Sequence, residues 1–367
     1  MRPTSKIGLD RRDFLIGTGA ALGASALGGS VALAQGSTVT TLMVNAVMNS
    51  PLRETMESVA GVKIEDAPFQ STTDVVSKLL APGGSSRFDL MVSGTEFSRI
   101  PVMGPSAGSE HCAALDMSKI PNASSISESF ARDIVTRDGE TYMLPLFWGY
   151  DSVLYNTEVA DPEDPYTQSW AMIFDDKYAG QIAWYDTAHQ MLLAAGLFLG
   201  MSEPEKMTKA DLDEVAKFLI SKKKNVRTFW TSFAQCSSLL GSGEIVATYG
   251  PIPVRVDLQK KGFPITNAWP KEGVVSFSQA GYIPKDAGNK DGALAVLNAF
   301  LSEEYASELV GASGYLTTSL LGTKGLTDEE KARLGYGILE GTTAAYPMVF
   351  PTDMGAWIEV WSRVKSA

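Results

Sequence analysis

Short apolar runs alternate with amphipathic helical segments soon after residue 37. A β-rich run, Thr40 to Val44, precedes a helical pattern that opens at Ser50-Pro51 and stops at Gly61. Proline at the first helical position and glycine after the last turn are the expected boundaries of a helix. Further along, the same signals predict a strand over 62–64, a helix over 73–80 and a strand over 88–92. This alternation predicts a parallel sheet covered by helices.

The second half of the chain carries similar signals. Thr208 and Asp211 form a capping box for a helix that ends near Lys222 to Asn225, where lysines suit the negative end of the helix dipole. A buried strand is predicted over 245–249 and one long helix over 291–309, because apolar residues recur at helical spacing. The length of 367 residues favours two domains. No repeat or proline-rich linker separates them, so we expect the chain to cross between them more than once.

The N-terminus has the pattern of an export signal. Arg11-Arg12 precedes an uncharged stretch, Phe14 to Ala34, that ends in the small-x-small sequence Ala32-Leu33-Ala34. The paired arginines favour the twin-arginine route, and we predict that residues 1–34 are cleaved. A membrane anchor is the alternative, but the stretch is rich in Gly, Ala and Ser and therefore poorly apolar. A periplasmic location follows, and no cysteine is placed for a lipoprotein.

Composition and charge exclude several classes of function. The formal net charge is −11, which argues against nucleic acid as a partner because such binding needs clustered Lys and Arg. Cys112 and Cys236 lie in no metal-binding pattern, so neither a metal nor a cofactor is predicted. Free buried thiols are favoured over one long-range disulfide.

The sequence lacks the common motifs of catalysis. It has no nucleophile elbow, no Walker A loop, no dinucleotide-binding glycine pattern after a strand and no H-E-x-x-H. His111 and His189 are its only histidines, and neither adjoins a Ser or Cys nucleophile in sequence. We therefore predict that the protein is not an enzyme. The alternative is an exported enzyme that uses a carboxylate pair such as Glu96 and Asp186.

A family resemblance becomes visible at the run from Leu144 to Asn156, which contains Pro145, Trp148-Gly149 and a strand ending in Asn. Extracellular solute-binding proteins of ABC importers, especially the spermidine/putrescine-binding group, carry a similar run. Further matching pieces follow in the same order: Ser169-Trp170, Tyr178 to Ile182, Ala183 to Asp186, Trp269 to Gly273, Ile283 to Lys285, Asn289 to Ala293 and Ser313 to Tyr315. The resemblance covers nearly all of the chain after the export signal.

The resemblance implies an α/β fold, the two-lobed periplasmic binding protein fold of type II, with a ligand cleft between lobes joined by hinge crossings. Lobe one would comprise residues 38–146 and 277–323, and lobe two residues 147–276 and 324–367. The protein would be a monomer that captures an amine-bearing, polyamine-like molecule by hinge closure and delivers it to the membrane permease of an ABC importer. A sensor role on the same fold is a further alternative, for instance for a zwitterionic amino compound.

The same resemblance implies the residues that contact the ligand. Asp186 matches the family's amine-binding acid, although it could instead cap a helix, and His189 falls where the family has a second acid. Tyr249 and Phe277 replace tryptophans as aromatic walls, and Tyr315 matches directly. The remaining expected positions are Gln279 in place of an Asp, Glu96 at a Tyr position, Asn45 and Met48 in a first-lobe wall, and Trp148 beside the hinge.

Counting the acids at these positions predicts the charge of the ligand. Two family acids are replaced by His189 and Gln279, while Asp186 and Glu96 remain, and Asp151 in Tyr150-Asp151 is a further acid near the hinge. An extended triamine would leave an ammonium group without a carboxylate, which is costly in a buried site. We therefore expect a diamine, an acylated polyamine or an amine-bearing zwitterion.

Overall fold

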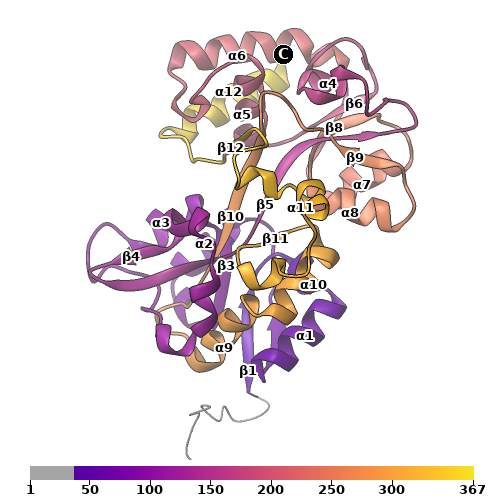
Figure 1. The fold of residues 1–367 in the computed structure, drawn as a ribbon. Helices are drawn as coiled ribbons and strands as arrows, with labels where there is room; N and C mark the ends of the chain where they lie inside the picture. Colours follow the sequence, from indigo (N-terminus) through magenta and orange to yellow (C-terminus); the bar gives the residue numbers. More distant parts are fainter. Residues whose placement is uncertain (1–36) are drawn as a thin grey trace, which may run out of the picture. The chain divides into compact units, whose positions relative to one another are not determined.

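The computed structural model describes residues 37–367, and the predicted export signal lies outside this range. The fold is built on a mixed sheet in which the strands follow the order β2-β1-β3-β10-β5-β8-β6-β7 (Figure 1). These strands are β1 (Thr38–Leu42), β2 (Lys63–Asp66), β3 (Leu90–Gly94), β5 (Glu140–Asn156), β6 (Ile182–Tyr185), β7 (Val226–Trp230), β8 (Ala247–Pro251) and β10 (Val274–Tyr282). Four shorter strands pair with β5 or β10: β4 (Val135–Arg137), β9 (Ile265–Asn267), β11 (Leu316–Thr317) and β12 (Ala345–Pro347).

Apart from the short parallel pair of β10 with β12, the sheet is parallel only toward its two ends. Strand β1 pairs in parallel with β2 and β3, and β6 pairs in parallel with β7 and β8. Between these groups, β10 runs antiparallel to both β3 and β5, and β5 runs antiparallel to β8. The expectation of a parallel sheet is therefore wrong for the centre, because two strands far apart in sequence insert there with opposite direction.

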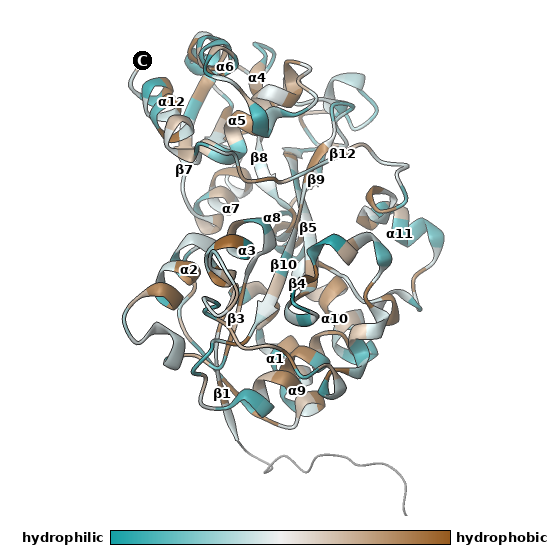
Figure 2. Ribbon diagram, turned by 90° about the vertical axis from the view of Figure 1, so that its left-hand side faces the viewer, coloured by the Kyte–Doolittle hydropathy of each residue, from teal (hydrophilic) through white to brown (hydrophobic). Residues whose placement is uncertain are grey.

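Helices cover both groups of parallel strands. Near β1 to β3 lie α1 (Ser50–Ala60), α2 (Thr72–Leu80), α3 (Thr95–Met103), α9 (Lys290–Phe300) and α10 (Glu303–Ser313). Near β6 to β8 lie α4 (Ala171–Phe174), α5 (Ala188–Phe198), α6 (Lys209–Lys222), α7 (Phe233–Gly241), α8 (Ile252–Lys260) and α12 (Met354–Ser366), with α11 (Asp328–Leu334) beside β5. Helix α1 packs on α9 and α10 (Figure 2), and α12 packs on α5 and α6.

Strands β5 and β10 connect the two groups. Residues 144–147 of β5 pair with the end of β10 that also contacts β3, whereas residues 151–155 pair with β8. The buried apolar side chains follow the same division, with one cluster around β6 to β8 and two around β1, β3 and β10. The predicted lobe boundaries, 146/147 and 276/277, fall inside these two strands.

Most of the predicted helix boundaries match the structure. Helix α1 begins at Ser50 and ends at Ala60, just before Gly61, whose φ is +69°, and α6 has the capping box of Thr208 with Asp211. The long helix predicted over 291–309 is wrong, because the structure has two helices, α9 and α10, at this position. Ser302 breaks it: its side chain accepts from the Tyr305 N–H and caps α10.

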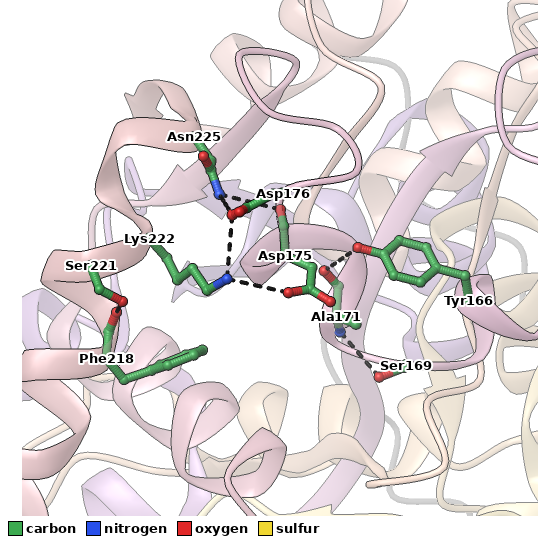
Figure 3. A network of polar contacts seen from close by, with 9 residues as sticks. All are labelled: Tyr166, Ser169, Ala171, Asp175, Asp176, Phe218, Ser221, Lys222 and Asn225. Carbon is green, nitrogen blue, oxygen red and sulfur yellow. Dashed lines mark hydrogen bonds and ion pairs between the residues drawn. The ribbon is translucent and has the colours of Figure 1, made fainter.

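The lysines at the end of α6 are used for tertiary contacts as well. Lys222 Nζ lies 3.3 Å from both Asp175 Oδ1 and Asp176 Oδ1, and Asn225 Nδ2 donates to Asp176 Oδ1 at 2.6 Å (Figure 3). These contacts attach the end of α6 to the segment that follows α4. Such exposed pairs contribute little to stability.

Both cysteines are free thiols, which confirms that prediction. Burial raises the pKa of the Cys112 thiol to about 12. Within residues 37–367, none of the helices combines the length and the apolar character needed to cross a bilayer.

Gly335 allows a close approach that a side chain would prevent. Its φ is +104°, and a Cβ atom would lie 2.7 Å from Tyr150 Cε1 and 3.1 Å from Trp269 Cη2. We expect Gly335→Ala to lower the free energy of unfolding by about 2–4 kcal/mol, because strain from positive φ and overpacking add. Gly341→Ala is the matched control and should lower the free energy of unfolding by only about 1 kcal/mol. Gly341 also has a positive φ, +73°, but a Cβ atom there would meet nothing within 4 Å, so only the backbone strain remains. Urea unfolding measures both, and equal losses would contradict the packing argument.

Candidate functional site

One face of the crossing strands gathers several of the predicted contact residues. In the antiparallel ladder, Gln279 lies opposite Phe147, Phe277 opposite Gly149, and Val275 opposite Asp151. Directly opposed residues project to the same face of a sheet, and alternate residues along a strand share that face. Asp151, Phe277 and Gln279 therefore line one side of the junction between the two parts of the sheet.

Asp151 is the chemically distinctive group on this face. Its side chain is 6% exposed, and the phenol of Tyr249, itself fully buried, donates to Asp151 Oδ2 at 2.8 Å. Tyr249 is placed by β8, where it pairs with Val153, and its ring stacks on Trp170 with centroids 5.5 Å apart. In the part of the chain that the structure describes, Asp151 has no ion pair with a basic side chain. It is thus a buried acid held by a neutral donor alone.

Aromatic rings surround this acid. The Tyr185 ring stacks on Trp230 at 4.0 Å and lies 6.1 Å from Tyr249, and Tyr315 lies 6.3 Å from Phe277. Gly149 makes room for two of these rings, because a Cβ there would lie 3.1 Å from Phe277 Cζ and 3.2 Å from Tyr315 Cδ1. Tyr185, Phe277 and Gln279 are only partly buried, so they border the site on its open side.

The electrostatics of the site follow from its burial. Desolvation raises the pKa of Asp151 to about 7, although the bond from Tyr249 opposes this shift. Burial, with the Asp151 charge as a smaller cause, raises the pKa of Tyr185 to about 12 and also raises those of Tyr249 and Tyr315. The phenols therefore remain protonated. A carboxylate among ring faces suits an ammonium group, which gains charge-assisted hydrogen bonds and cation–π attraction.

The structure brings together four of the predicted contact residues: Tyr249, Phe277, Gln279 and Tyr315. It adds Asp151, the acid that the sequence indicated near the hinge. Trp148 is not part of this group, because it alternates with Gly149 and faces the other side of β5. Its indole N–H donates to the Thr317 carbonyl at 3.1 Å, and its ring packs on Tyr336. At 1% exposure, Trp148 has a packing role.

Asp186 is directed away from the site, toward α12. Its Oδ1 accepts from the Trp361 indole at 2.8 Å and lies 2.7 Å from Lys365 Nζ. Nor does it cap α5, because the N-cap is Thr187, which makes no side-chain capping bond. In this structure Asp186 therefore caps no helix, and its carboxylate is paired with Lys365.

His189 is also committed to internal contacts. The ring is 4% exposed, its Nε2–H donates to the Val349 carbonyl at 2.9 Å, and burial lowers its pKa to about 4. Phe97 of α3 meets the ring edge-on at 5.2 Å, and Phe350 does so at 6.0 Å. His189 thus joins α5 to α3 and to the C-terminal segment as a neutral side chain.

The remaining predicted residues lie in the part of the fold around β1 to β3. Glu96 Oε1 lies 3.7 Å from Arg99 Nη2 on the same helix. Met48 is 4% exposed, in the core cluster that also contains Tyr315. Asn45 is exposed at the start of a short 3₁₀ turn. Among residues 37–367, no hydrogen bond or ion pair joins these three to Asp151.

Sequence reasoning missed Tyr185, Trp230 and Trp170. The alternation of side chains along a strand could have indicated Tyr185. Trp184 and Asp186 both contact Trp361 of α12. Tyr185, which stands between them, projects to the other side, toward Trp230. Trp230 and Trp170 gave no comparable signal, because their neighbours come from distant segments. Among residues 37–367, no group of three or more His, Cys, Asp or Glu side chains could hold a metal ion.

The raised pKa of Asp151 has a measurable effect on stability. In the unfolded chain the carboxyl titrates near 3.8, so between about pH 4 and 7 the folded state binds a proton that the unfolded state does not. The contribution of Asp151 to the free energy of unfolding should therefore fall as pH rises through this window, whereas His189, whose pKa is lowered, contributes in the opposite direction below about pH 6.5. We expect Asp151→Asn to gain thermal stability over the unaltered protein as pH rises, by at least about 1 °C at pH 8. Thermal unfolding at pH 5, 6.5 and 8 tests this, and a parallel pH dependence in both proteins would contradict it.

Sequence similarity connects this chain to bacterial solute-binding proteins. The sequence model described as bacterial extracellular solute-binding protein matches residues 53–322. Spermidine/putrescine-binding periplasmic protein 1 of Haemophilus influenzae is 25% identical over 269 residues, covering 73% of this chain and 72% of that protein. Putrescine-binding periplasmic protein SpuD of Pseudomonas aeruginosa is 27% identical over 265 residues, covering 68% and 69%.

The solved structures agree with the fold class that the sequence predicted. The substrate-binding protein PotD of a spermidine/putrescine ABC transporter from Streptococcus pneumoniae superposes with a TM-score of 0.73. It is 19% identical, and the match covers 90% of this chain and 99% of that one. The two-lobed α/β fold is thereby confirmed. Together with the match of the family model to most of the chain, it shows that this protein belongs to the family of bacterial extracellular solute-binding proteins.

Proposed function

We propose that the protein is the substrate-binding component of an ABC importer and captures an amine-bearing small molecule in the periplasm. One observation carries the ligand class: Asp151 is a buried acid without a basic partner, enclosed by Tyr185, Tyr249, Phe277 and Tyr315. A cation is the ligand that such a group requires, because an isolated buried carboxylate is unfavourable. The names of the relatives, which are spermidine/putrescine- and putrescine-binding proteins, support the same class.

The position of the acid supports binding by hinge closure. Asp151 and Phe277 lie on β5 and β10, the two strands that pass between the groups of parallel strands. We propose the lobes at residues 38–146 with 277–323 and at 147–276 with 324–367. A ligand on these strands would contact both lobes in the closed state and so shift the equilibrium toward it. The closed form would then be the one recognised by the permease.

Export and assembly complete the proposal. The twin-arginine pattern and cleavage after Ala34 account for a periplasmic location, which the periplasmic relatives support. We propose a monomer that acts without a cofactor and does no chemistry on its ligand. The enzyme alternative uses a carboxylate pair such as Glu96 and Asp186. Each of these two carboxylates already lies beside a basic group, Arg99 for Glu96 and Lys365 for Asp186.

Ligand-dependent thermal unfolding tests the ligand class. Protein purified from the periplasm of an expressing bacterium is heated with and without millimolar amines, amino acids, sugars and inorganic anions. A ligand at 100 times its dissociation constant should add about 2.7 kcal/mol, a shift of a few degrees at this size. We expect an amine to raise the midpoint at pH 8 and to act less at pH 6, because Asp151 is then largely protonated. A response to sugars or anions with none to amines would refute the proposal.

Small-angle X-ray scattering tests the closure. We expect the radius of gyration to fall by about 0.5–1 Å when an active amine saturates the protein, because both lobes must contact one ligand. The Asp151→Asn protein at the same amine concentration is the control and should show no change. An unchanged radius in the presence of a tightly bound amine would show that capture does not involve closure.

A further inference from the structure

The acids near the site differ in whether a basic group already neutralises them. Asp186 contacts Lys365 Nζ at 2.7 Å, and Glu96 contacts Arg99 Nη2 at 3.7 Å. Asp151 contacts only the phenol of Tyr249, at 2.8 Å. Of the acids that the sequence selected, Asp151 alone is thus left to balance the charge of a ligand.

The other polar positions of the site carry no charge. Gln279, on the same face as Asp151 and partly exposed, is an amide. His189 is buried and neutral, with its Nε2–H used by the Val349 carbonyl. Among residues 37–367, no lysine or arginine is one of the charged groups that influence Asp151, Tyr185, Tyr249 or Tyr315. The site therefore offers one negative charge and no positive charge.

We propose that the site selects ligands with one ammonium group and an uncharged remainder, the class of N-acylated diamines, and disfavours free diamines, polyamines and zwitterions. The ammonium group binds Asp151 and lies against the tyrosine rings. A second ammonium group, or a carboxylate, would enter the aromatic enclosure without a counterion, which is costly. This inference rests on the proposed function, because it concerns the ligand of the same site.

Gln279 gives the far end of such a ligand a matching partner. Its ladder partner Phe147 is four residues from Asp151 along β5, which places Gln279 about 13 Å away along the strand direction. Its side chain can donate to and accept from the amide of an acyl group at once. The methylene chain between the two polar ends would lie along Phe277, which sits between Val275 and Gln279 on this face.

Isothermal titration calorimetry at pH 8 tests the selectivity, with N-acetylputrescine, putrescine, spermidine and γ-aminobutyrate as probes. We expect N-acetylputrescine to bind at least tenfold more tightly than each of the other three. Asp151→Asn should weaken its binding at least 30-fold, because a charge-assisted bond in a buried site is lost. Asp257→Asn is the matched control, an acid-to-amide change at an exposed pair with Lys261, and should stay within twofold.

Gln279→Glu keeps the proposal testable even if the Asp151 variant folds poorly. Adding a carboxylate at this position should raise the affinity for putrescine relative to N-acetylputrescine at least tenfold, because the second ammonium group gains a partner. Putrescine, spermidine or γ-aminobutyrate binding the unaltered protein more tightly than N-acetylputrescine would overturn the inference and leave the proposed function intact. Loss of binding in Asp186→Asn but not in Asp151→Asn would overturn it too. Absence of binding by every amine would refute the proposed function itself.

Discussion

The antiparallel ladder between β5 and β10 is the constraint on which the rest of the structure depends. Strand β10 pairs with β3 and β5 pairs with β8, while β5 and β10 pair with each other, so the two groups of parallel strands share one hydrogen-bonded centre. The ladder also fixes which side chains share a face. Asp151, Phe277 and Gln279 occur together because of this register, and a slip of β10 by one residue would send Phe277 and Gln279 to the side opposite Asp151.

The buried acid on this ladder is a local weakness of the fold that a bound cation would relieve. Asp151 loses the hydration of its charge and gains one hydrogen bond from Tyr249, which is why its pKa rises to about 7. A side chain that served only packing would avoid this cost. Strongly perturbed ionisable groups concentrate at functional sites, because there a ligand supplies the missing partner. The aromatic rings around Asp151 exclude water, which strengthens the attraction for a cation.

Membership of the family establishes the fold of this protein but does not establish which side chains bind the ligand. The match of the family model and the superposition on PotD concern the fold, which is shared over most of the chain. Asp186, which matches a family acid, and Glu96, which stands at a family Tyr position, both have internal partners, Lys365 and Arg99 respectively. An acid can therefore match the family position in sequence while its carboxylate forms an ion pair with the C-terminal helix. For this reason the ligand is inferred from the contacts of this chain and not from sequence matches alone.

The sequence by itself determined the local elements and the family. Capping residues such as Thr208 and stop signals such as Gly61 act on their immediate neighbours, so they can be recognised from the sequence without knowledge of the fold. It did not determine the orientation of Asp186 or the role of Trp148. Those depend on which face of a strand meets which distant segment: α12 reaches Asp186 from 175 residues away. Only the tertiary structure decided that Asp151, rather than Asp186, faces the aromatic rings, because the charge partner of a side chain is set by long-range packing.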